Sequence, residues 1–249
     1  MKINGNTILI TGGATGIGLA MTETFVNAGN EVIICGRREE KLQEAQELLP
    51  PIHARQCDVS KSDEREALFE WITGDFSNLN ILINNAGIQR RIDFTRGTEQ
   101  LLAGENEVEI NLVAPIQLSA QFIPFLAEKE EAAIVNVSSG LGFVPLAFMP
   151  VYCATKAAVH SFTYSLRHQL RNTTIKVFEV IPPTVDTELD KGERAKWGGL
   201  AYMGIPASEV AQATLSGMEN DQFEIAVGQA ENLASTWEFT QAFQNMNRF

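Results

Sequence analysis

Short runs of apolar residues alternate with longer amphipathic segments along the chain. The short runs are rich in Ile and Val and too brief for helices, so they predict β-strands. These predicted strands are Thr7–Thr11, Glu31–Cys35, Ile52–Cys57, Ile81–Asn84, Ala132–Ser138, Ile175–Ile181 and Phe223–Val227. The segments between them predict helices over residues 16–28, 38–49, 61–75, 98–127, 152–171 and 207–219.

The alternation of strands and helices predicts a doubly wound α/β fold with three layers, in which helices cover both faces of a parallel sheet. No repeat, low-complexity tract or linker divides the sequence, so we expect one domain over residues 1–249. Ligands of such sheets bind beyond the carboxyl ends of the strands. The informative residues should therefore follow the strands directly.

Composition narrows the class of protein. Of the 249 residues 45% are hydrophobic and 20% are charged, which is typical of soluble globular chains. The 19 basic and 31 acidic residues give a net charge of −12, which disfavours nucleic acid and anionic membranes as partners. The uncharged stretches 110–127 and 132–155 contain prolines and polar residues, so we expect no membrane span.

The cysteines and histidines suggest neither a disulfide framework nor a metal site. Cys35, Cys57 and Cys153 form no C-x-x-C pair, and no basic-then-apolar leader follows Met1, so we expect a reducing cytoplasmic setting. The three histidines lack the spacing of metal ligands, and we interpret His160 as a packing or surface residue.

A glycine-rich segment follows the first predicted strand and opens the first predicted helix. Its sequence is Thr11-Gly12-Gly13-Ala14-Thr15-Gly16-Ile17-Gly18. Glycines allow a tight turn that brings backbone N–H groups close to a pyrophosphate at the positive end of a helix. No Lys follows the glycines, which excludes a Walker loop. A strand–helix turn without a ligand is the alternative.

The end of the second predicted strand indicates which cofactor is used. Folds that bind NAD usually place an acid here to bond the ribose 2′-hydroxyl. This chain has Gly36 followed by Arg37 and Arg38. We expect Arg37 to bind a 2′-phosphate, which favours NADP. For Arg38 we favour a solvated position opposite Glu39 and Glu40.

Three candidate catalytic residues lie between positions 139 and 156. Tyr152 and Lys156 are four residues apart in a predicted helix and share one face. A lysine ammonium about 4 Å from a phenol favours the phenolate by up to ~4 kcal/mol. This lowers the pKa of the phenol toward a working pH. Ser139 follows the fifth strand and could hydrogen-bond a substrate oxygen. The Tyr–Lys spacing is also common on surface helices, so its context decides.

These motifs together resemble the short-chain dehydrogenase/reductase family over essentially the whole chain. The matching residues are Thr11-Gly12-x-x-x-Gly16-Ile17-Gly18, Asn84-Asn85-Ala86-Gly87, Asn111, Ser139 and Tyr152-x-x-x-Lys156. Residues 84–90, 138–146, 150–158 and 182–189 resemble more narrowly the DltE-type oxidoreductase branch. The family implies a Rossmann fold with a seven-stranded sheet.

The resemblance also implies residue roles. Tyr152 would be the acid/base, Ser139 would orient the carbonyl, Lys156 would bind the nicotinamide ribose, and Asn111 would hold a relay water. The family implies cofactor contacts from Gly12, Ala14, Thr15, Gly16, Ile17, Gly18, Asp58, Val59, Asn85, Ala86, Gly87, Tyr152, Lys156, Pro182, Val185 and Thr187. Pro182-Pro183 stands where the family usually has Pro-Gly, which stiffens this loop.

The expected function is that of an NADP(H)-dependent oxidoreductase that interconverts a carbonyl and a secondary alcohol. Apolar residues near the site suggest a partly hydrophobic substrate: Leu141, Phe143, Val144, Leu146, Phe148 and Met149. Residues 185–205 have the length of a substrate lid, and a helical insert packed against a partner subunit is the alternative. The family implies a homodimer or homotetramer. The alternatives are a non-catalytic dinucleotide sensor, which would need a lost catalytic residue, and an epimerase or dehydratase, which usually has a longer carboxyl-terminal region.

Overall fold

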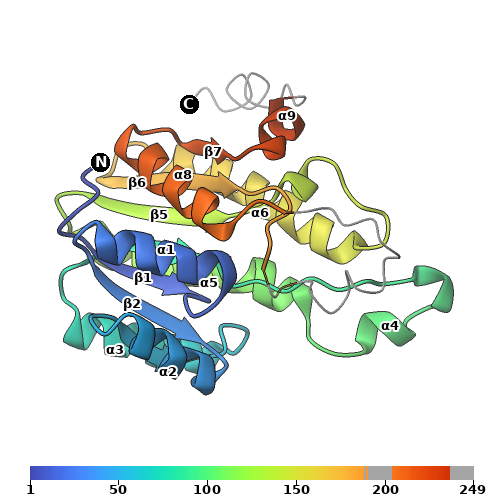
Figure 1. Cartoon of the computed structure of the whole chain (residues 1–249), viewed down its shortest axis with the longest axis horizontal. Helices are drawn as coiled ribbons and strands as arrows, with labels where there is room; N and C mark the ends of the chain where they lie inside the picture. Colours follow the sequence, from blue (N-terminus) through green and yellow to red (C-terminus); the bar gives the residue numbers. More distant parts are fainter. Residues whose placement is uncertain (188, 190–203, 236–249) are drawn as a thin grey trace.

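A computed structural model of the chain describes residues 1–187, 189 and 204–235. The strands of this part form one parallel sheet in the order β3-β2-β1-β4-β5-β6-β7 (Figure 1). Their bounds are β1 Thr7–Thr11, β2 Glu31–Gly36, β3 His53–Gln56, β4 Leu79–Asn84, β5 Ala132–Val137, β6 Ile175–Ile181 and β7 Glu224–Ala226. The predicted doubly wound α/β fold is confirmed, and each predicted strand is present with ends shifted by two residues at most.

Helices cover both faces of the sheet. The main ones are α1 Gly16–Asn27, α2 Glu39–Leu48, α3 Ser62–Asp75, α5 Ala114–Leu126, α6 Pro150–Gln169 and α8 Ala207–Glu219. Shorter elements are η1 Phe94–Arg96, α4 Glu99–Leu102, the π-helix η2 Glu109–Val113, the 3₁₀ turn η3 Gly140–Gly142 and α9 Gln229–Ser235. No helix in the described ranges is long and apolar enough to cross a bilayer.

The strand residues alternate between two cores, which explains the layering. Ile8 and Ile10 of β1 belong to a cluster that includes Phe25 of α1, on the face where α8 also packs. Leu9 points to the opposite face and belongs to a cluster that includes Phe122 of α5. Because β1 is buried on both faces, it is a continuous apolar run, as expected of a central parallel strand.

The strand order reverses direction between β1 and β4. The chain runs from β1 outward to β3 on one side of the sheet and from β4 outward to β7 on the other. The loops that follow β1 and β4 therefore separate to opposite faces and leave a crevice at their carboxyl ends. The glycine-rich segment after β1 and the Asn84-Asn85 segment after β4 meet at this crevice.

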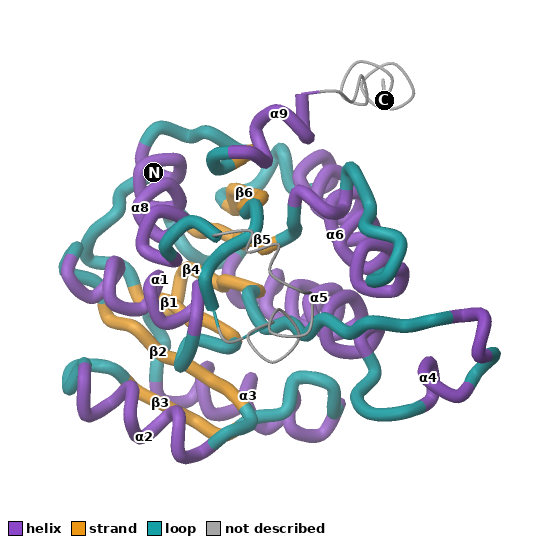
Figure 2. Tube along the Cα trace, turned by 45° about the vertical axis from the view of Figure 1, so that its right-hand side comes forward, coloured by secondary structure: helices purple, strands orange, loops and turns teal. Residues whose placement is uncertain are grey.

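The helix predicted over residues 98–127 is interrupted, which corrects the sequence analysis. α4 ends at Leu102, and a new helix begins only after Asn106, whose side chain accepts a hydrogen bond from Val108 N (3.0 Å). Gly104 has a φ of +80°, and Arg90 donates to the carbonyl of Ala103. Figures 1 and 2 both show the segment with α4 projecting from the body of the molecule. We call residues 97–106 the arm.

Candidate active site

The loop after β1 is built around glycines that no other residue could replace without rearrangement. Gly12 has a φ of +66°, which side chains rarely permit. A Cβ at Gly18 would lie 2.1 Å from the Gly12 carbonyl oxygen and 2.6 Å from Asn85 Nδ2. The backbone at Gly18 therefore packs directly against the backbone at Gly12 where α1 begins. The free N–H groups and the helix dipole at this end of α1 favour an anion. This cradle fits the pyrophosphate of a dinucleotide.

The segment after β4 fixes this cradle. Thr11 Oγ1 accepts hydrogen bonds from the backbone N–H of Asn85 and Ala86, both at 3.0 Å. Asn85 Nδ2 in turn donates to the Thr11 carbonyl at 2.9 Å and to the Gly12 carbonyl at 3.3 Å. Two loops that are far apart in sequence are therefore joined at the centre of the crevice.

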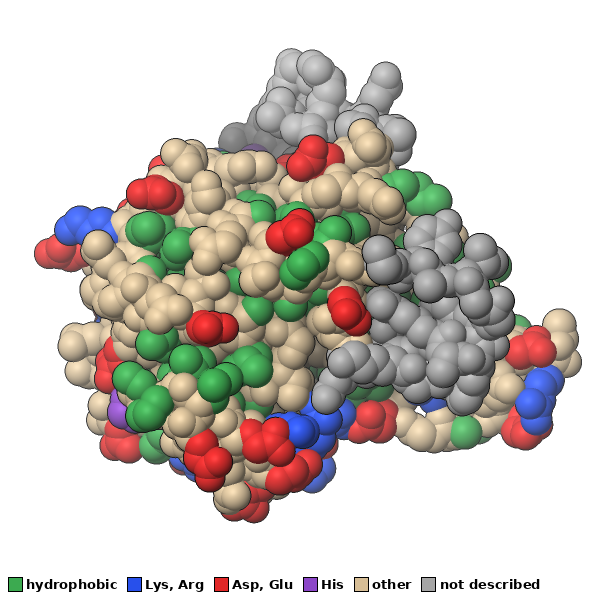
Figure 3. Space-filling view, viewed as in Figure 1, with side chains coloured by type: hydrophobic (Ala, Val, Ile, Leu, Met, Phe, Trp, Pro, Cys, Tyr) green, Lys and Arg blue, Asp and Glu red, His purple; other side chains and the backbone are tan. Residues whose placement is uncertain are grey.

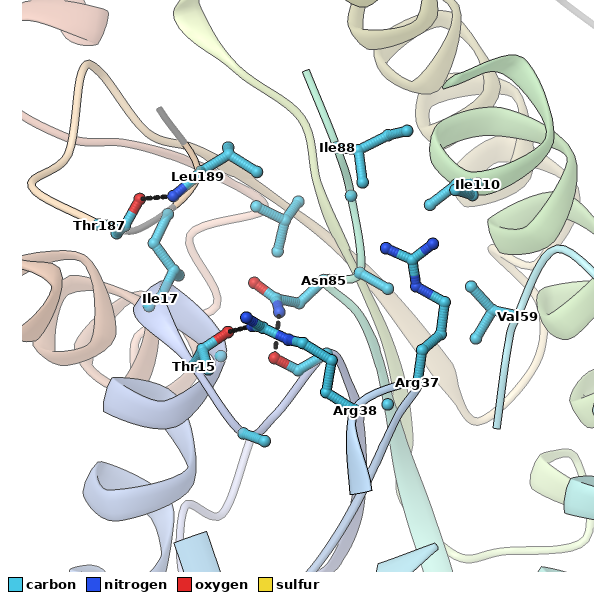
Figure 4. Close-up of a pocket in the computed structure, with 18 of the residues that line it drawn as sticks. Thr15, Ile17, Arg37, Arg38, Val59, Asn85, Ile88, Ile110, Thr187 and Leu189 are labelled. Carbon is cyan, nitrogen blue, oxygen red and sulfur yellow. Dashed lines mark hydrogen bonds between the residues drawn. The ribbon is translucent and has the colours of Figure 1, made fainter. Parts of the chain in front are cut away.

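The two arginines after β2 take different directions. Arg37 forms an ion pair with Glu105 of the arm, with a second Nη2–Oε2 contact of 3.3 Å. Arg38 Nη2 donates to Thr15 Oγ1 at 3.2 Å, so its guanidinium lies over the glycine loop. Figure 4 shows Arg38 reaching toward Thr15, whereas Arg37 extends in a different direction. Both are exposed and both line the cavity, so Arg38 has the solvated position expected for it and in addition contacts Thr15.

The loop after β3 closes the same end of the cavity. Asp58 Oδ1 accepts from the backbone N–H and the hydroxyl of Ser60, at 3.0 and 2.8 Å. Glu64 Oε2 accepts from the Asp58 N–H at 2.6 Å. Arg65 is buried beneath the loop and donates to the Val59 carbonyl at 2.5 Å. These bonds hold Asp58 and Val59 at the cavity wall.

Tyr152 and Lys156 lie together near the start of α6, at the other end of the cavity. The Lys156 ammonium donates to the Val137 carbonyl at the end of β5 (2.8 Å) and lies 5.8 Å from the centre of the Tyr152 ring. Burial lowers the pKa of Lys156 from 10.5 to about 8, and the negative charge of Glu179 opposes this shift. The lysine is a buried cation held next to a nearly buried phenol.

Ser139 and Asn111 are buried beside this pair. Ser139 Oγ accepts from Leu141 N at 3.1 Å, which starts the turn η3. Asn111 Nδ2 donates to the Ile88 carbonyl (2.8 Å) and to Thr155 Oγ1 (3.2 Å), and its Oδ1 accepts from Ile88 N (2.9 Å). The Asn111 side chain therefore ties the loop after β4 to α6. It lies in a π-helix, a feature frequent at functional sites.

These groups share one cavity of about 330 Å³. Of the predicted site residues, the following line it: Gly12, Ala14, Thr15, Gly16, Ile17, Gly18, Arg37, Asp58, Val59, Asn85, Ala86, Gly87, Tyr152, Lys156, Pro182 and Thr187. Asn111 and Ser139 lie one residue from the lining residues Ile110 and Ser138. Val185 is not in the wall and instead forms a parallel bridge with Ile205.

The segment predicted as a substrate lid, residues 185–205, is described only at its two ends. Asp186 N donates to the Ile205 carbonyl at 2.9 Å, and Ile205 N donates to the Thr184 carbonyl at 3.0 Å. Thr187 reaches the glycine loop, since its Cγ2 lies 3.2 Å from where a Cβ of Gly16 would be. Residues 188 and 190–203 lie outside the described part of the chain.

Sequence reasoning missed several polar residues around the site. His160, one helical turn after Lys156 on α6, forms a buried pair with Glu179, and Thr155 accepts a hydrogen bond from Asn111. Glu107, which is fully buried, accepts from Arg90 N at 2.9 Å. No local pattern identifies them, because each contact joins residues that are distant along the chain.

The comparisons with known proteins agree with this geometry. The chain matches the short chain dehydrogenase family over residues 6–197. It therefore belongs to the short-chain dehydrogenase/reductase family, as its motifs predict. The oxidoreductase DltE of Bacillus subtilis (strain 168), described as uncharacterized, is 51% identical over 249 residues, which cover 99% of this chain and 98% of the relative. The predicted DltE-type branch is thus confirmed.

Two further relatives are more distant. The NADP-dependent 3-hydroxy acid dehydrogenase YdfG of Shigella flexneri is 32% identical over 179 residues, or 72% of each chain. A solved structure of a short-chain dehydrogenase from Sphingobium yanoikuyae in complex with NADPH is 26% identical, with a TM-score of 0.83. That likeness covers 98% of this chain and 96% of the other.

Proposed function

We propose that this protein is an NADP(H)-dependent oxidoreductase that interconverts a carbonyl and a secondary alcohol. The observation that carries the proposal is that Tyr152 and Lys156 open into the same cavity as the glycine cradle after β1. The residues fit a dinucleotide, because Gly12 and Gly18 leave room for backbone contact and α1 begins there. The YdfG and Sphingobium relatives, whose names carry NADP and NADPH, support a nicotinamide dinucleotide as the cofactor.

The nicotinamide would supply or accept the hydride, and the residues of this chain would manage the proton. On reduction the Tyr152 hydroxyl donates a proton to the carbonyl oxygen, and on oxidation its phenolate takes the proton back. The Ser139 hydroxyl donates a hydrogen bond that orients the same oxygen. The Lys156 ammonium favours the Tyr152 phenolate by its positive charge.

Asn111 would serve the proton relay through its backbone. Its side chain is already occupied by Ile88 and Thr155, so the carbonyl is the group left for a water. Pro115 stands four residues later and has no N–H to donate to this carbonyl. If Pro115 only shapes packing, Pro115→Ala leaves turnover and its pH profile unchanged.

The preference for NADP(H) rests on the charges beyond β2. Gly36 places no carboxylate where a 2′-phosphate would lie, and Arg37 and Arg38 both line that end of the cavity. A guanidinium can donate two parallel hydrogen bonds to a phosphate. Arg38 lies over Thr15 and is therefore a second phosphate ligand in this proposal, beside Arg37.

The test is a paired titration of the purified protein with NADPH and NADH, followed by nicotinamide fluorescence at fixed ionic strength. We expect NADPH to bind more tightly, and Arg37→Ala and Arg38→Ala each to weaken NADPH binding about 10- to 100-fold, the range of a hydrogen bond to a charged group. NADH affinity should change little. Arg171→Ala, which removes an exposed arginine beyond α6, is the control.

The outcomes separate the parts of the proposal. A preference for NADH contradicts the assignment of Arg37 and Arg38 and leaves the Tyr152 chemistry intact. Binding of neither cofactor contradicts the function as a whole. If NADPH binds, a panel of ketones and secondary alcohols should show stoichiometric cofactor consumption that is lost in Tyr152→Phe, whereas an epimerase would regenerate its cofactor.

Three further properties belong to this proposal. A partly hydrophobic substrate is supported by Leu141 and Phe148, which pack on a cluster that contains Tyr152. A reducing, cytoplasmic setting is supported by the three cysteines, which are all buried free thiols. A homodimer or homotetramer through α5 and α6 is expected by analogy with the family, and light scattering tests it.

Figure 3 shows acidic side chains scattered over the visible face, with basic ones in separate groups.

A further inference from the structure

A row of polar side chains crosses four neighbouring strands at matching register. Asn84 of β4 pairs in register with Asn136 of β5, Asn136 with Glu179 of β6, and Glu179 with Glu224 of β7. Asn84 Nδ2 donates to Asn136 Oδ1 at 2.9 Å. A row of this kind in the middle of a sheet must find partners in the helices above it, because unpaired buried polar groups are costly.

The helices α5 and α6 supply those partners one by one. Ser119 of α5 accepts from Asn84, and Thr163 of α6 accepts from Asn136 at 3.0 Å. At the outer end, Glu224 accepts hydrogen bonds from Tyr164 and Arg167 of α6. Glu224 is 40% exposed and has a cationic partner, so its charge is compensated there.

Glu179 differs from Glu224 because it is a carboxylate with no exposure to solvent. Its two oxygens lie 3.1 and 2.9 Å from Nδ1 of His160, which is also buried. The rings of Phe143 and Tyr164 flank the imidazole, with centroids at 4.5 and 4.9 Å. A neutral imidazole that donates through Nδ1 orients the carboxylate but leaves its negative charge in place.

The cation that balances this charge is Lys156. Lys156 and His160 are four residues apart on α6 and therefore share one face of the helix. The Lys156 ammonium bonds the carbonyl of Val137, the residue that follows Asn136, and Asn136 is the strand neighbour of Glu179. Burial lowers the pKa of Lys156, and Glu179 is the charged group that raises it.

We propose that Glu179, oriented by His160, is a positioning residue: it is the buried counter-charge that keeps Lys156 protonated, and it acts on Tyr152 through Lys156. Among the described residues, the charged and titratable groups around the pair are Lys156, Tyr164 and Arg167 from α6 and Glu224 from β7. With a neutral His160, the charges of Glu179 and Lys156 cancel, which is the arrangement that a buried cluster favours. The inference rests on the roles proposed above for Tyr152 and Lys156.

The test follows ionisation in the free protein and needs no substrate. NMR of isotope-labelled lysine, assigned with Lys156→Met, gives the titration midpoint of Lys156. Tyrosinate absorption, with Tyr152→Phe as reference, gives that of Tyr152. In Glu179→Gln we expect the Lys156 midpoint to fall and the Tyr152 midpoint to rise, each by about one pH unit, because a single charge interaction at a buried site is of that size.

Glu224→Gln is the matched control, since it removes a carboxylate from the next strand at the same register. It should leave both midpoints unchanged. If His160 were an imidazolium paired with Glu179, it would lose its proton once Gln replaced the carboxylate, and the net charge of the pair would stay at zero. An unchanged Lys156 midpoint therefore overturns the proposal. An unchanged Tyr152 midpoint overturns its second step.

A measurement on the unaltered protein covers the case in which Glu179→Gln does not fold. Nitrogen NMR of the three histidines should show His160 neutral at pH 7 with the proton on Nδ1, and an imidazolium there contradicts the proposal. Failure of NADPH and NADH to bind would refute the proposed function and leave these titrations readable, so the two outcomes are distinguishable.

Discussion

The glycine at position 18 shows how closely single residues determine the cofactor cradle. A Cβ at this position would overlap the Gly12 carbonyl oxygen, which is backbone and cannot move aside alone. We expect Gly18→Ala to destabilise the fold by about 1–3 kcal/mol, as overpacking does, and to abolish NADPH binding. Thermal unfolding and the fluorescence titration measure the two effects.

Gly74 provides the matched control for that substitution. It lies in α3, where nothing within 4 Å would meet a new Cβ. Gly74→Ala should stabilise the protein slightly, by up to about 1 kcal/mol, because alanine favours helix more than glycine does. Tight NADPH binding by Gly18→Ala would show that the loop rearranges at little cost, contrary to the overlap seen here.

At the scale of the residue, the sequence predicts the motifs but does not predict where individual side chains point. The glycines, Tyr152 and Lys156 are recognisable because their chemistry requires those residue types at a fixed spacing. Arg38 is exposed, as the sequence predicts, but the sequence does not reveal that Thr15 lies within its reach. For His160 the sequence favours a packing or surface position, because its partner Glu179 lies on another element.

At the scale of the element, the arm couples the loop after β4 to the cofactor cavity. Its Glu105 is paired with Arg37, the residue proposed to bind a 2′-phosphate. The carboxylate therefore competes with the phosphate for the same guanidinium. We expect Glu105→Gln to tighten NADPH binding about two- to fivefold, the range of an exposed ion pair, and to leave NADH binding unchanged.

Glu99→Gln is the control for this prediction. It removes the same charge from α4, where the partner is Arg96 and no cavity residue is involved. The fluorescence titration of both variants at low and moderate salt separates a local effect from a change in net charge, because only long-range effects are strongly screened. Equal changes in the two variants, or an equal change for NADH, would contradict competition at Arg37.

The arm also shows why an element can be mispredicted. The apolar spacing after residue 108 is helical. Spacing alone does not show where the helix begins, because it contains no information on the contacts that stabilise helix ends. Arg90 takes the carbonyls of Gln100, Leu101 and Ala103, which then do not accept hydrogen bonds from a continuing helix. Glu107 pairs with the same Arg90 side chain, with an Nε–Oε2 distance of 3.5 Å.

At the scale of the whole molecule, the buried Lys156 costs stability at neutral pH. Its pKa is about 8 in the folded protein and near 10.5 when exposed, so between these values the unfolded chain binds more protons. The free energy of unfolding should therefore rise from about pH 8 to 10.5, by about 3 kcal/mol in all from this residue. In Lys156→Met this rise should be absent, and the variant should be more stable than the parent at pH 7.

Urea unfolding at a series of pH values measures this difference. Lys156→Met also loses the hydrogen bond to Val137, so its net gain at pH 7 should be smaller than the full electrostatic value. Tyr152→Phe, one turn away, is the control and should keep the pH dependence that Lys156 causes. Parallel curves for the parent and Lys156→Met would show that Lys156 is not strained by burial.

The sequence by itself determined the sheet, the layers, the glycine cradle and the Tyr152–Lys156 pair. These depend on periodicity and on motifs in which the interacting residues are close along the chain. Only the tertiary structure decided where Arg38 points, where the helix before α5 breaks, and that Glu179 pairs with His160. Each of those depends on a contact between elements, and the energy of such a contact is set by burial and distance, which no local pattern contains.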